Sequence, residues 1–187
     1  MMGQFSSKQL SRALRAALLT AGICALPAVH AADGTISLAG EISGQTCSIS
    51  GNGGGKDFTV KLPDIVASSL GSDGATTGAT AFDITLSNCT PGSGNVSTYF
   101  EPGTTINTAT GQLKNTSGTA ANVEIGLLNK DKSAIKLGSA HPAQNSKYVP
   151  IASGSAKLEY YAQYVASGGG AGSGTVNTSV LYSLIYQ

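Results

Sequence analysis

Few residues between positions 32 and 187 could carry out chemistry. His141 is the only histidine in this range, so a Ser/His/Asp arrangement would have to use it. It precedes Pro142 in a polar stretch, residues 138–147, which is typical of a surface loop, and the sequence has no Gly-x-Ser-x-Gly turn. The 10 acidic residues are scattered and form no evident acid/base pair. We therefore expect no enzymatic activity, no cofactor and no metal.

The first 31 residues are typical of a secretory signal peptide. The basic residues Lys8, Arg12 and Arg15 precede an apolar run that covers residues 16–29, and small residues predict cleavage after Ala31. Polar and helix-breaking residues interrupt the run, which is shorter than the roughly 20 apolar residues that span a bilayer. We therefore expect residues 1–31 to be removed on export.

The composition narrows the possible classes of protein. The chain has 187 residues, 11% of them charged, and a formal net charge of +1. Without residues 1–31 it keeps only lysines as basic residues, and acidic residues slightly outnumber them. So low and balanced a charge argues against a nucleic-acid binder and against a charge-rich disordered chain. The remaining length suits one domain, since a chain of about 150 residues buries roughly 70% of its unfolded surface.

Cys47 and Cys89 are the only cysteines after residue 31. A structural metal site would need four ligands such as cysteine or histidine, and the available residues fall short of that number. Two cysteines in an exported chain are most simply explained by a disulfide. Closing a loop of about 40 residues would stabilise the fold by roughly 4 kcal/mol.

Alternation of apolar and polar residues, with a period of two, dominates the rest of the sequence and predicts β-strands. Gly-rich turns at residues 51–55, 71–74, 91–94 and 168–174 separate the runs. None of these turns has the following Lys-Ser/Thr and helix of a phosphate-binding loop. Many short strands without a helical stretch predict an all-β sandwich. The alternating residues are Phe58, Val60, Leu62; Phe82, Ile84, Leu86; Val96, Thr98, Phe100; Val123, Ile125, Leu127; Leu158, Tyr160, Ala162, Tyr164; and Val176, Thr178, Val180, Tyr182, Leu184, Tyr186.

The segment 35–42 also alternates, but its role is ambiguous from the pattern alone. Ile36, Leu38 and Ile42 share one face, and Gly40 interrupts it where a core strand would prefer a side chain. One interpretation is an ordinary first strand with a bulge or a close backbone approach at Gly40. The other is a free strand that docks on another molecule.

The C-terminal run, residues 174–187, is apolar on its even-numbered face, and Leu181 and Ile185 add apolar groups to the other. An exposed edge of this kind promotes aggregation unless another strand pairs with it. We therefore expect a partner strand beside it.

Several stretches, in this order and spacing, carry a family resemblance. They are residues 34–47, 60–63, 81–89, 99–103, 122–126 and 158–164, and a C-terminal segment in which Gly174 is fourteenth from the end and Tyr186 is penultimate. Together they resemble the major subunits of chaperone–usher fimbriae of the type 1 pilus kind. The resemblance covers essentially all of residues 32–187.

The resemblance implies an incomplete immunoglobulin-like sandwich, the pilin fold, which lacks its last strand. It implies an N-terminal donor-strand extension at residues 32–45 and a pilin domain at residues 46–187. The donor residues would be Ile36, Leu38, Gly40 and Ile42, which would fill a groove in the next subunit. Gly40 would then lie where the groove is too shallow for a side chain.

The resemblance also implies partners. A periodic head-to-tail assembly of identical subunits would form a surface fimbria used in adhesion, exported through the periplasm and carrying tip adhesin or adaptor subunits. A periplasmic chaperone would hold the C-terminal strand first, and an outer-membrane usher would exchange it for the next subunit. A minor adaptor of the same organelle and, less well supported, a secreted sugar-binding adhesin remain alternatives. The residues of the chaperone and groove strand would be Gly174, Val176, Val180, Tyr182, Leu184, Tyr186 and Gln187, with the Gln187 carboxylate bound by basic chaperone residues.

Overall fold

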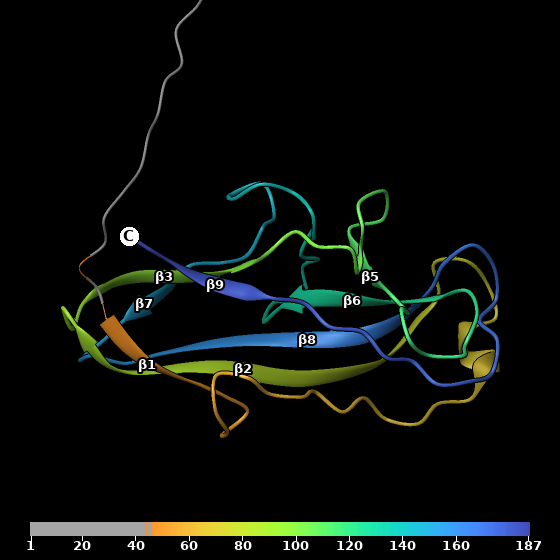
Figure 1. The fold of residues 1–187 in the computed structure, drawn as a ribbon, viewed down its shortest axis with the longest axis horizontal. Coiled ribbons are helices and arrows are strands. Elements are labelled where there is room, and N and C mark those ends of the chain that lie inside the picture. Colours follow the sequence, from red (N-terminus) through yellow and green to blue (C-terminus); the bar gives the residue numbers. More distant parts are fainter. Residues whose placement is uncertain (1–43, 45) are drawn as a thin grey trace, which may run out of the picture. The chain divides into compact units, whose positions relative to one another are not determined.

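The computed structural model describes Gly44 and residues 46–187, which form two facing β-sheets (Figure 1). The expected signal peptide at residues 1–31 and the four expected donor residues lie outside the described residues. Among the residues that are described, no helix has the length and apolarity to cross a membrane. The described part of the chain contains one short 3-10 helix, η1 (Ala67–Leu70).

The larger sheet has six strands in the order β1-β2-β8-β6-β5-β4, and every neighbouring pair is antiparallel. Its centre is the long pairing of β2 with β8, which is interrupted by one bulge between Thr77 and Thr80. The strands are β1 (Thr46–Gly51), β2 (Thr76–Thr90), β4 (Ile106–Asn107), β5 (Gln112–Lys114), β6 (Val123–Asn129) and β8 (Ala156–Ala166).

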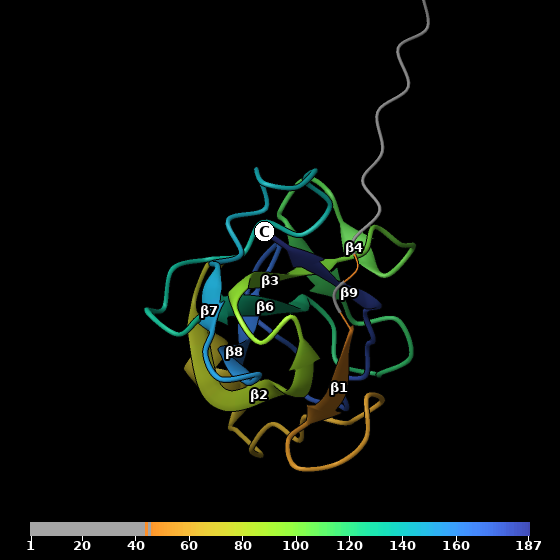
Figure 2. The same cartoon turned by 90° about the vertical axis from the view of Figure 1, so that its left-hand side faces the viewer.

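The smaller sheet has three antiparallel strands in the order β7-β3-β9. They are β3 (Gly94–Phe100), β7 (Val149–Ile151) and β9 (Tyr182–Tyr186). The end view in Figure 2 shows this sheet lying across from β2, β8 and β6. Strand β9 is an edge strand, because β3 is its only partner among the described residues.

The core lies between the two sheets and follows the predicted alternation. On β2, for example, Phe82, Ile84 and Leu86 are buried, and the residues between them are half-buried. The Tyr160 ring of β8 packs in a tilted arrangement against Phe82 and meets Phe100 edge to face, so aromatic rings link the two sheets. Other buried members of this cluster are Val96, Ile106, Leu113, Ile125, Leu127, Ile135, Leu137, Ile151 and Leu158.

The all-β sandwich expected from the sequence is confirmed, but two predicted strands are wrong in part. Residues 58–62 alternate as predicted, yet they form no strand. The C-terminal strand begins only at Tyr182, whereas residues 176–181 are extended without pairing in a sheet. The physical reason is similar in both places, because a strand needs a continuous row of main-chain hydrogen bonds to a neighbour. In the described structure residues 58–62 make none, and residues 176–181 make only isolated ones, at Asn177 and Leu181. These two segments enclose the site described next.

Candidate functional site

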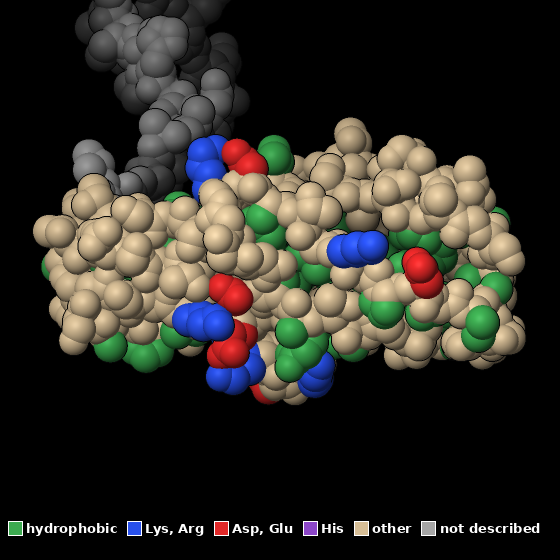
Figure 3. All heavy atoms as spheres, turned by 90° about the horizontal axis from the view of Figure 1, so that it is seen from below, with side chains coloured by type: hydrophobic (Ala, Val, Ile, Leu, Met, Phe, Trp, Pro, Cys, Tyr) green, Lys and Arg blue, Asp and Glu red, His purple; other side chains and the backbone are tan. Residues whose placement is uncertain are grey.

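An apolar groove of about 950 Å³ lies between two chain segments, residues 56–65 and 173–182. Figure 1 shows the first segment running beside β2 and the second leading into β9. On the face drawn in Figure 3, hydrophobic side chains are visible in recesses between polar and backbone atoms. The floor of the groove consists of core side chains from both sheets: Phe82, Ile84, Phe100, Leu113, Ile125 and Leu127.

The first wall of the groove is the segment 56–65. Phe58, Val60 and Leu62 are half-buried and pack against the core, so the alternation of this segment serves the groove. Within residues 46–187, the main chain from Phe58 to Leu62 makes no hydrogen bond. The wall is attached instead at its ends, where the carbonyl oxygens of Lys56 and Pro63 accept hydrogen bonds from tyrosine hydroxyls.

The second wall is the segment 173–182, and one asparagine fixes its first part. The side-chain oxygen of Asn115 accepts hydrogen bonds from the N–H groups of Gly118 and Asn177, at 3.0 and 2.9 Å. The Asn115 amide nitrogen donates to the carbonyl oxygens of Ala120 and Thr175, at 2.9 and 3.1 Å. Asn115 therefore ties the wall to the loop at residues 115–120.

Beyond this attachment, the second wall also has a free main chain. Val176 and Val180 are half-buried against the core, whereas Leu181 points away and is 78% exposed. The main chain from Thr178 to Val180 makes no hydrogen bond to any residue that the structure describes. Two extended segments with unpaired main-chain groups thus border one apolar cleft. This arrangement suits an added strand, because the strand could pair with the main chain and bury alternate side chains.

The predicted residues of the chaperone and groove strand divide into two sets. Gly174, Val176, Val180 and Tyr182 line the groove. Leu184 and Tyr186 pack against the core where β9 pairs with β3. At the end of the chain, the N–H and carbonyl groups of Gln187 both bond to the main chain of Asn95, at 2.8 and 2.7 Å.

Two tyrosines at the groove are held in their neutral form. Burial, followed by the nearby Asp57, raises the pKa of Tyr182. Burial, followed by Asp64, likewise raises the pKa of Tyr164. A tyrosine hydroxyl with the ordinary pKa of about 10 is already protonated at neutral pH, and the raised pKa extends this to more alkaline pH. Both hydroxyls can therefore donate to the carbonyl oxygens of the first wall.

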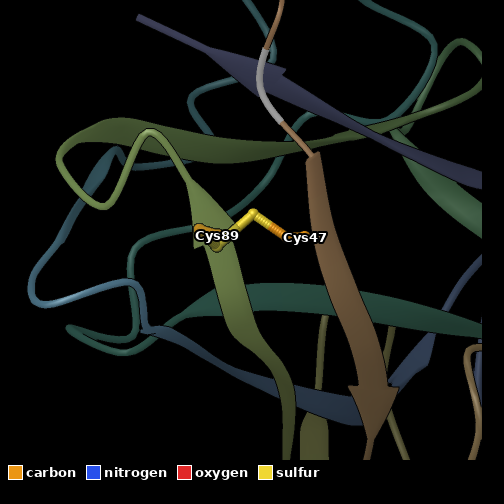
Figure 4. The surroundings of a disulfide bond; sticks show 2 residues. All are labelled: Cys47 and Cys89. Carbon is orange, nitrogen blue, oxygen red and sulfur yellow. A yellow bond between two sulfur atoms is a disulfide. The ribbon is translucent and has the colours of Figure 1, made fainter.

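The expected disulfide between Cys47 and Cys89 is present and joins β1 to β2 (Figure 4). Their Cα atoms are 4.1 Å apart, and Cys89 is buried. Because β1 pairs only with β2 among the described strands, the bond secures an edge strand of the larger sheet. Strand β1 begins directly after the expected donor extension, so the disulfide fixes the point at which that extension would leave the domain.

His141 lies away from the groove. Its Nε2 atom is 3.3 Å from the Tyr148 hydroxyl and 3.4 Å from Ser97 Oγ, and its ring meets those of Tyr99 and Tyr148 edge to face. Ser97 is fully buried, so it is not accessible as a nucleophile. Across Gly44 and residues 46–187, no group of three or more His, Cys, Asp or Glu side chains could hold a metal ion.

Sequence reasoning did not identify Asn115 as the residue that attaches the second wall, or Thr178 as a residue that lines the groove. Asn115 contacts residues about 60 positions away, a distance over which local patterns give no signal. The alternating pattern predicted Thr178 only as a residue of the C-terminal strand. Its interruption of the apolar row at residues 176–182 was the only signal that could have singled it out.

Comparison with known proteins decides the family. The family model described as "Type-1 fimbrial protein, A" matches residues 62–187, which include both the floor and the second wall of the groove. The chain belongs to the type-1 fimbrial protein family. It is thus a fimbrial subunit of the chaperone–usher type, a family of structural proteins.

Several curated relatives of the subunit are fimbrial proteins. It is 44% identical to the major fimbrial subunit SMF-1 of Stenotrophomonas maltophilia, over 86% of this chain and 96% of the relative. It is also 44% identical to the F17 fimbrial protein of Escherichia coli, over 86% and 91% of the two chains. Such components belong to surface pili.

Solved structures support the same fold. The P pilus rod subunit PapA covers 75% of this chain with 99% of its own, at a TM-score of 0.58 and 21% identity. A chaperone–usher pilus structure covers 87% of this chain with 100% of its own, at a TM-score of 0.56 and 20% identity. The subunit therefore has the pilin fold, an incomplete immunoglobulin-like sandwich.

Proposed function

We propose that this subunit polymerises head to tail, with residues 32–45 of one copy filling the groove of another, and that the resulting fimbria serves in adhesion. The observation that carries the proposal is the apolar groove bordered by two unpaired main-chain segments, residues 58–62 and 178–180. Donor-strand complementation of pilins is an established case of strand addition. Our proposal extends that case to this chain.

The alternation of the expected donor segment supports this assembly. Ile36, Leu38 and Ile42 share one face, which can enter an apolar groove while the other face stays outside. Main-chain pairing with the walls would supply affinity, and the alternate side chains would fix the register. Since donor and groove lie on different parts of one chain, each contact is heterologous, and repeated contacts build an open filament.

Before assembly, the same groove needs another occupant, because an exposed apolar cleft invites aggregation. We assign that role to a periplasmic chaperone that pairs with the C-terminal segment and binds the Gln187 carboxylate. An outer-membrane usher then exchanges the chaperone for the next subunit, and tip adhesin or adaptor subunits complete the organelle. The subunit thus passes through the periplasm to the cell surface.

Deletion of residues 32–43 tests the proposal in cells that also make the chaperone and usher. The deletion leaves all of the groove, so the variant should still bind chaperone but form no multimers. A matched control keeps the chain length and replaces Ile36, Leu38 and Ile42 by serine, which should have the same effect. Unboiled extracts of the wild type should show a ladder of multimers that collapses to one band on heating in detergent. Normal filaments from the deletion strain would refute the proposal.

A further inference from the structure

The second wall of the groove is held by two different supports. Strand β9 pairs with β3, and just beyond the end of β3 the N–H of Glu101 donates to the carbonyl oxygen of Leu181, at 2.8 Å. Earlier in the wall, the main chain of Thr175 and Asn177 is bonded instead to the loop at residues 115–120. A strand therefore supports one end of the wall, and a loop supports the other.

The loop satisfies the main-chain groups of both wall residues that it contacts. The Thr175 N–H donates to Thr119 Oγ1 at 3.0 Å, and the Thr175 carbonyl oxygen accepts from the Asn115 amide at 3.1 Å. The Asn177 N–H donates to Asn115 Oδ1 at 2.9 Å, and the Asn177 carbonyl oxygen accepts from the N–H of Thr116 at 3.1 Å. Thr175 and Asn177 thus turn their main-chain groups toward the loop.

The residues that alternate with these two have unpaired main-chain groups. In an extended chain, the N–H and carbonyl groups of successive residues point to opposite sides. The main chain of Val176, Thr178 and Val180 therefore points away from the loop, and it makes no hydrogen bond to any residue that the structure describes. This is the edge with which an added strand can pair. By holding Thr175 and Asn177, the loop fixes the direction of that edge.

Asn115 is the centre of this attachment. Its side chain makes four hydrogen bonds, the full capacity of an amide. Two of them brace the loop, since Oδ1 accepts from the Gly118 N–H and Nδ2 donates to the Ala120 carbonyl oxygen, at 3.0 and 2.9 Å. The other two reach Thr175 and Asn177. The approach of loop and wall also requires a glycine, because a Cβ on Gly118 would lie 2.1 Å from the Thr175 carbonyl oxygen.

We propose that Asn115 is a positioning residue for the strand that fills the groove, because it holds the free edge at residues 176–180 in the direction needed for pairing. The inference rests on the proposed function and names a residue outside the groove that sets the affinity for its occupant. Asn115 does not line the groove, so it acts through Thr175 and Asn177. Without it, the occupant would have to order this part of the wall on binding, at a cost in conformational entropy.

The role of Asn115 is confined to one part of the groove. Beyond Leu181 the edge belongs to β9, which β3 holds independently of the loop. Pairing of an occupant near Leu184 should therefore be the same with or without the Asn115 side chain, whereas pairing near Val176 should weaken. A general loss of stability would instead weaken the binding of any occupant, wherever it pairs.

Dissociation of donor peptides tests the proposal. The full chain, with the three serine replacements in its own donor segment, is refolded with a labelled peptide of residues 32–45, and release of the label is followed in excess unlabelled peptide. Asn115→Ala should speed release about tenfold, because two hydrogen bonds to the wall are lost. Two shorter peptides, residues 37–45 and 32–41, each lack one end of the apolar row. For the one that no longer reaches Val176, Asn115→Ala should have no effect, and for the other the effect should persist.

An equal effect of Asn115→Ala on all three peptides, or no effect on any, would overturn the inference. Failure of the 32–45 peptide to bind the chain that keeps Asn115 is a different result, and it would refute the proposed function on which the inference rests.

Two further variants separate positioning from stability. Asn129→Ala removes a fully buried amide that bonds Ser133 Oγ and the Asn145 carbonyl oxygen away from the groove, at 3.0 and 2.9 Å. It should lower the urea midpoint at least as much as Asn115→Ala but leave peptide release unchanged. Thr119→Val removes only the bond from the Thr175 N–H at an exposed position, so it keeps the test available if Asn115→Ala fails to fold. It should speed release about threefold with the same dependence on peptide. Unchanged release from Thr119→Val, or faster release from Asn129→Ala, would contradict the assigned role.

Discussion

Tyr182 and Phe58 meet across the groove, with their rings edge to face and their centroids 6.3 Å apart. The Tyr182 hydroxyl also donates a hydrogen bond to the carbonyl oxygen of Lys56 at 2.8 Å. Since Tyr182 begins β9 and Phe58 belongs to the first wall, these contacts join the two walls directly. A strand that enters here must part the two residues or pass over them.

The variant Tyr182→Phe should assemble faster than the wild type. It keeps the ring contact with Phe58 but loses the hydrogen bond to Lys56, so the walls separate at lower cost. A neutral hydrogen bond contributes about 1 kcal/mol, which corresponds to an increase of roughly fivefold in rate if the bond breaks before the donor enters. The rate at which refolded subunit without chaperone forms multimers measures this effect, because a chaperone in the groove would already hold the walls apart. Tyr186→Phe is the control, and an unchanged rate for Tyr182→Phe would contradict the prediction.

Removing the disulfide should destabilise the subunit substantially. The bond closes a loop between residues separated by 42 positions, so Cys47→Ser with Cys89→Ser should lower the free energy of unfolding by about 4 kcal/mol. Urea denaturation measures the change, and the amount of chaperone-bound subunit in the periplasm should fall with it. Reductant should lower the urea midpoint of the wild type and leave that of the double variant unchanged. An equal midpoint for both proteins without reductant would show that the bond is dispensable.

Gly174 should not tolerate a side chain. A Cβ atom there would lie 2.5 Å from the Ala120 nitrogen, and the φ angle of Gly174 is +150°. Gly174→Ala should therefore lower the free energy of unfolding by about 2 kcal/mol or more. Gly53→Ala is the matched control, because Gly53 also has a positive φ, +74°, but a Cβ there meets nothing within 4 Å. Equal losses for the two variants would assign the effect to backbone strain alone and contradict the role of close packing.

Alkaline pH should destabilise the fold partly through Tyr160. This buried residue donates a hydrogen bond to Thr98 Oγ1 at 2.9 Å, and burial raises its pKa. The folded chain thus holds the phenol proton more tightly than the unfolded chain, whose pKa is about 10. Stability is therefore retained below about pH 10 and is lost as the pH rises above it.

Urea midpoints between pH 7 and pH 11 measure this dependence. Tyr160→Phe should make the alkaline decline shallower, while costing about 1 kcal/mol at pH 7 because Thr98 loses its partner. Tyr161→Phe, a change at the neighbouring residue on the other face of β8, should keep the decline of the wild type. A decline as steep in Tyr160→Phe as in the wild type would mean that other groups account for it.

The sequence was sufficient to predict the strands in which burial alternates over several residues. Phe82, Ile84 and Leu86 of β2 are an example, since one face of the strand meets the core and the other does not. The short strands β4, β5 and β7 were missed, because two or three residues do not establish a period. Strand β1 was missed for a different reason, since two serines and a threonine make up half of its length.

The groove shows what alternation can and cannot reveal. Phe58 and Val180 alternate with polar neighbours as strand residues do, and both were predicted to be in strands. Periodicity reports which side chains are buried, but a strand also depends on whether a neighbour is present to pair with the main chain. The attachment by Asn115 could not be foreseen either, because it joins a loop to a segment about 60 positions later.

The position of the disulfide has a mechanical consequence. Any pull on the chain before β1 reaches Cys47 after one residue of that strand, and the sulfur bridge passes the load to Cys89 on β2. Strand β2 is the longest strand described and pairs with β8 along most of its length, so the force spreads over the centre of the larger sheet as shear. Strand β1 therefore cannot be peeled away from its free end, and tension along a filament would have to break the sheet or a covalent bond to unravel the subunit from this side.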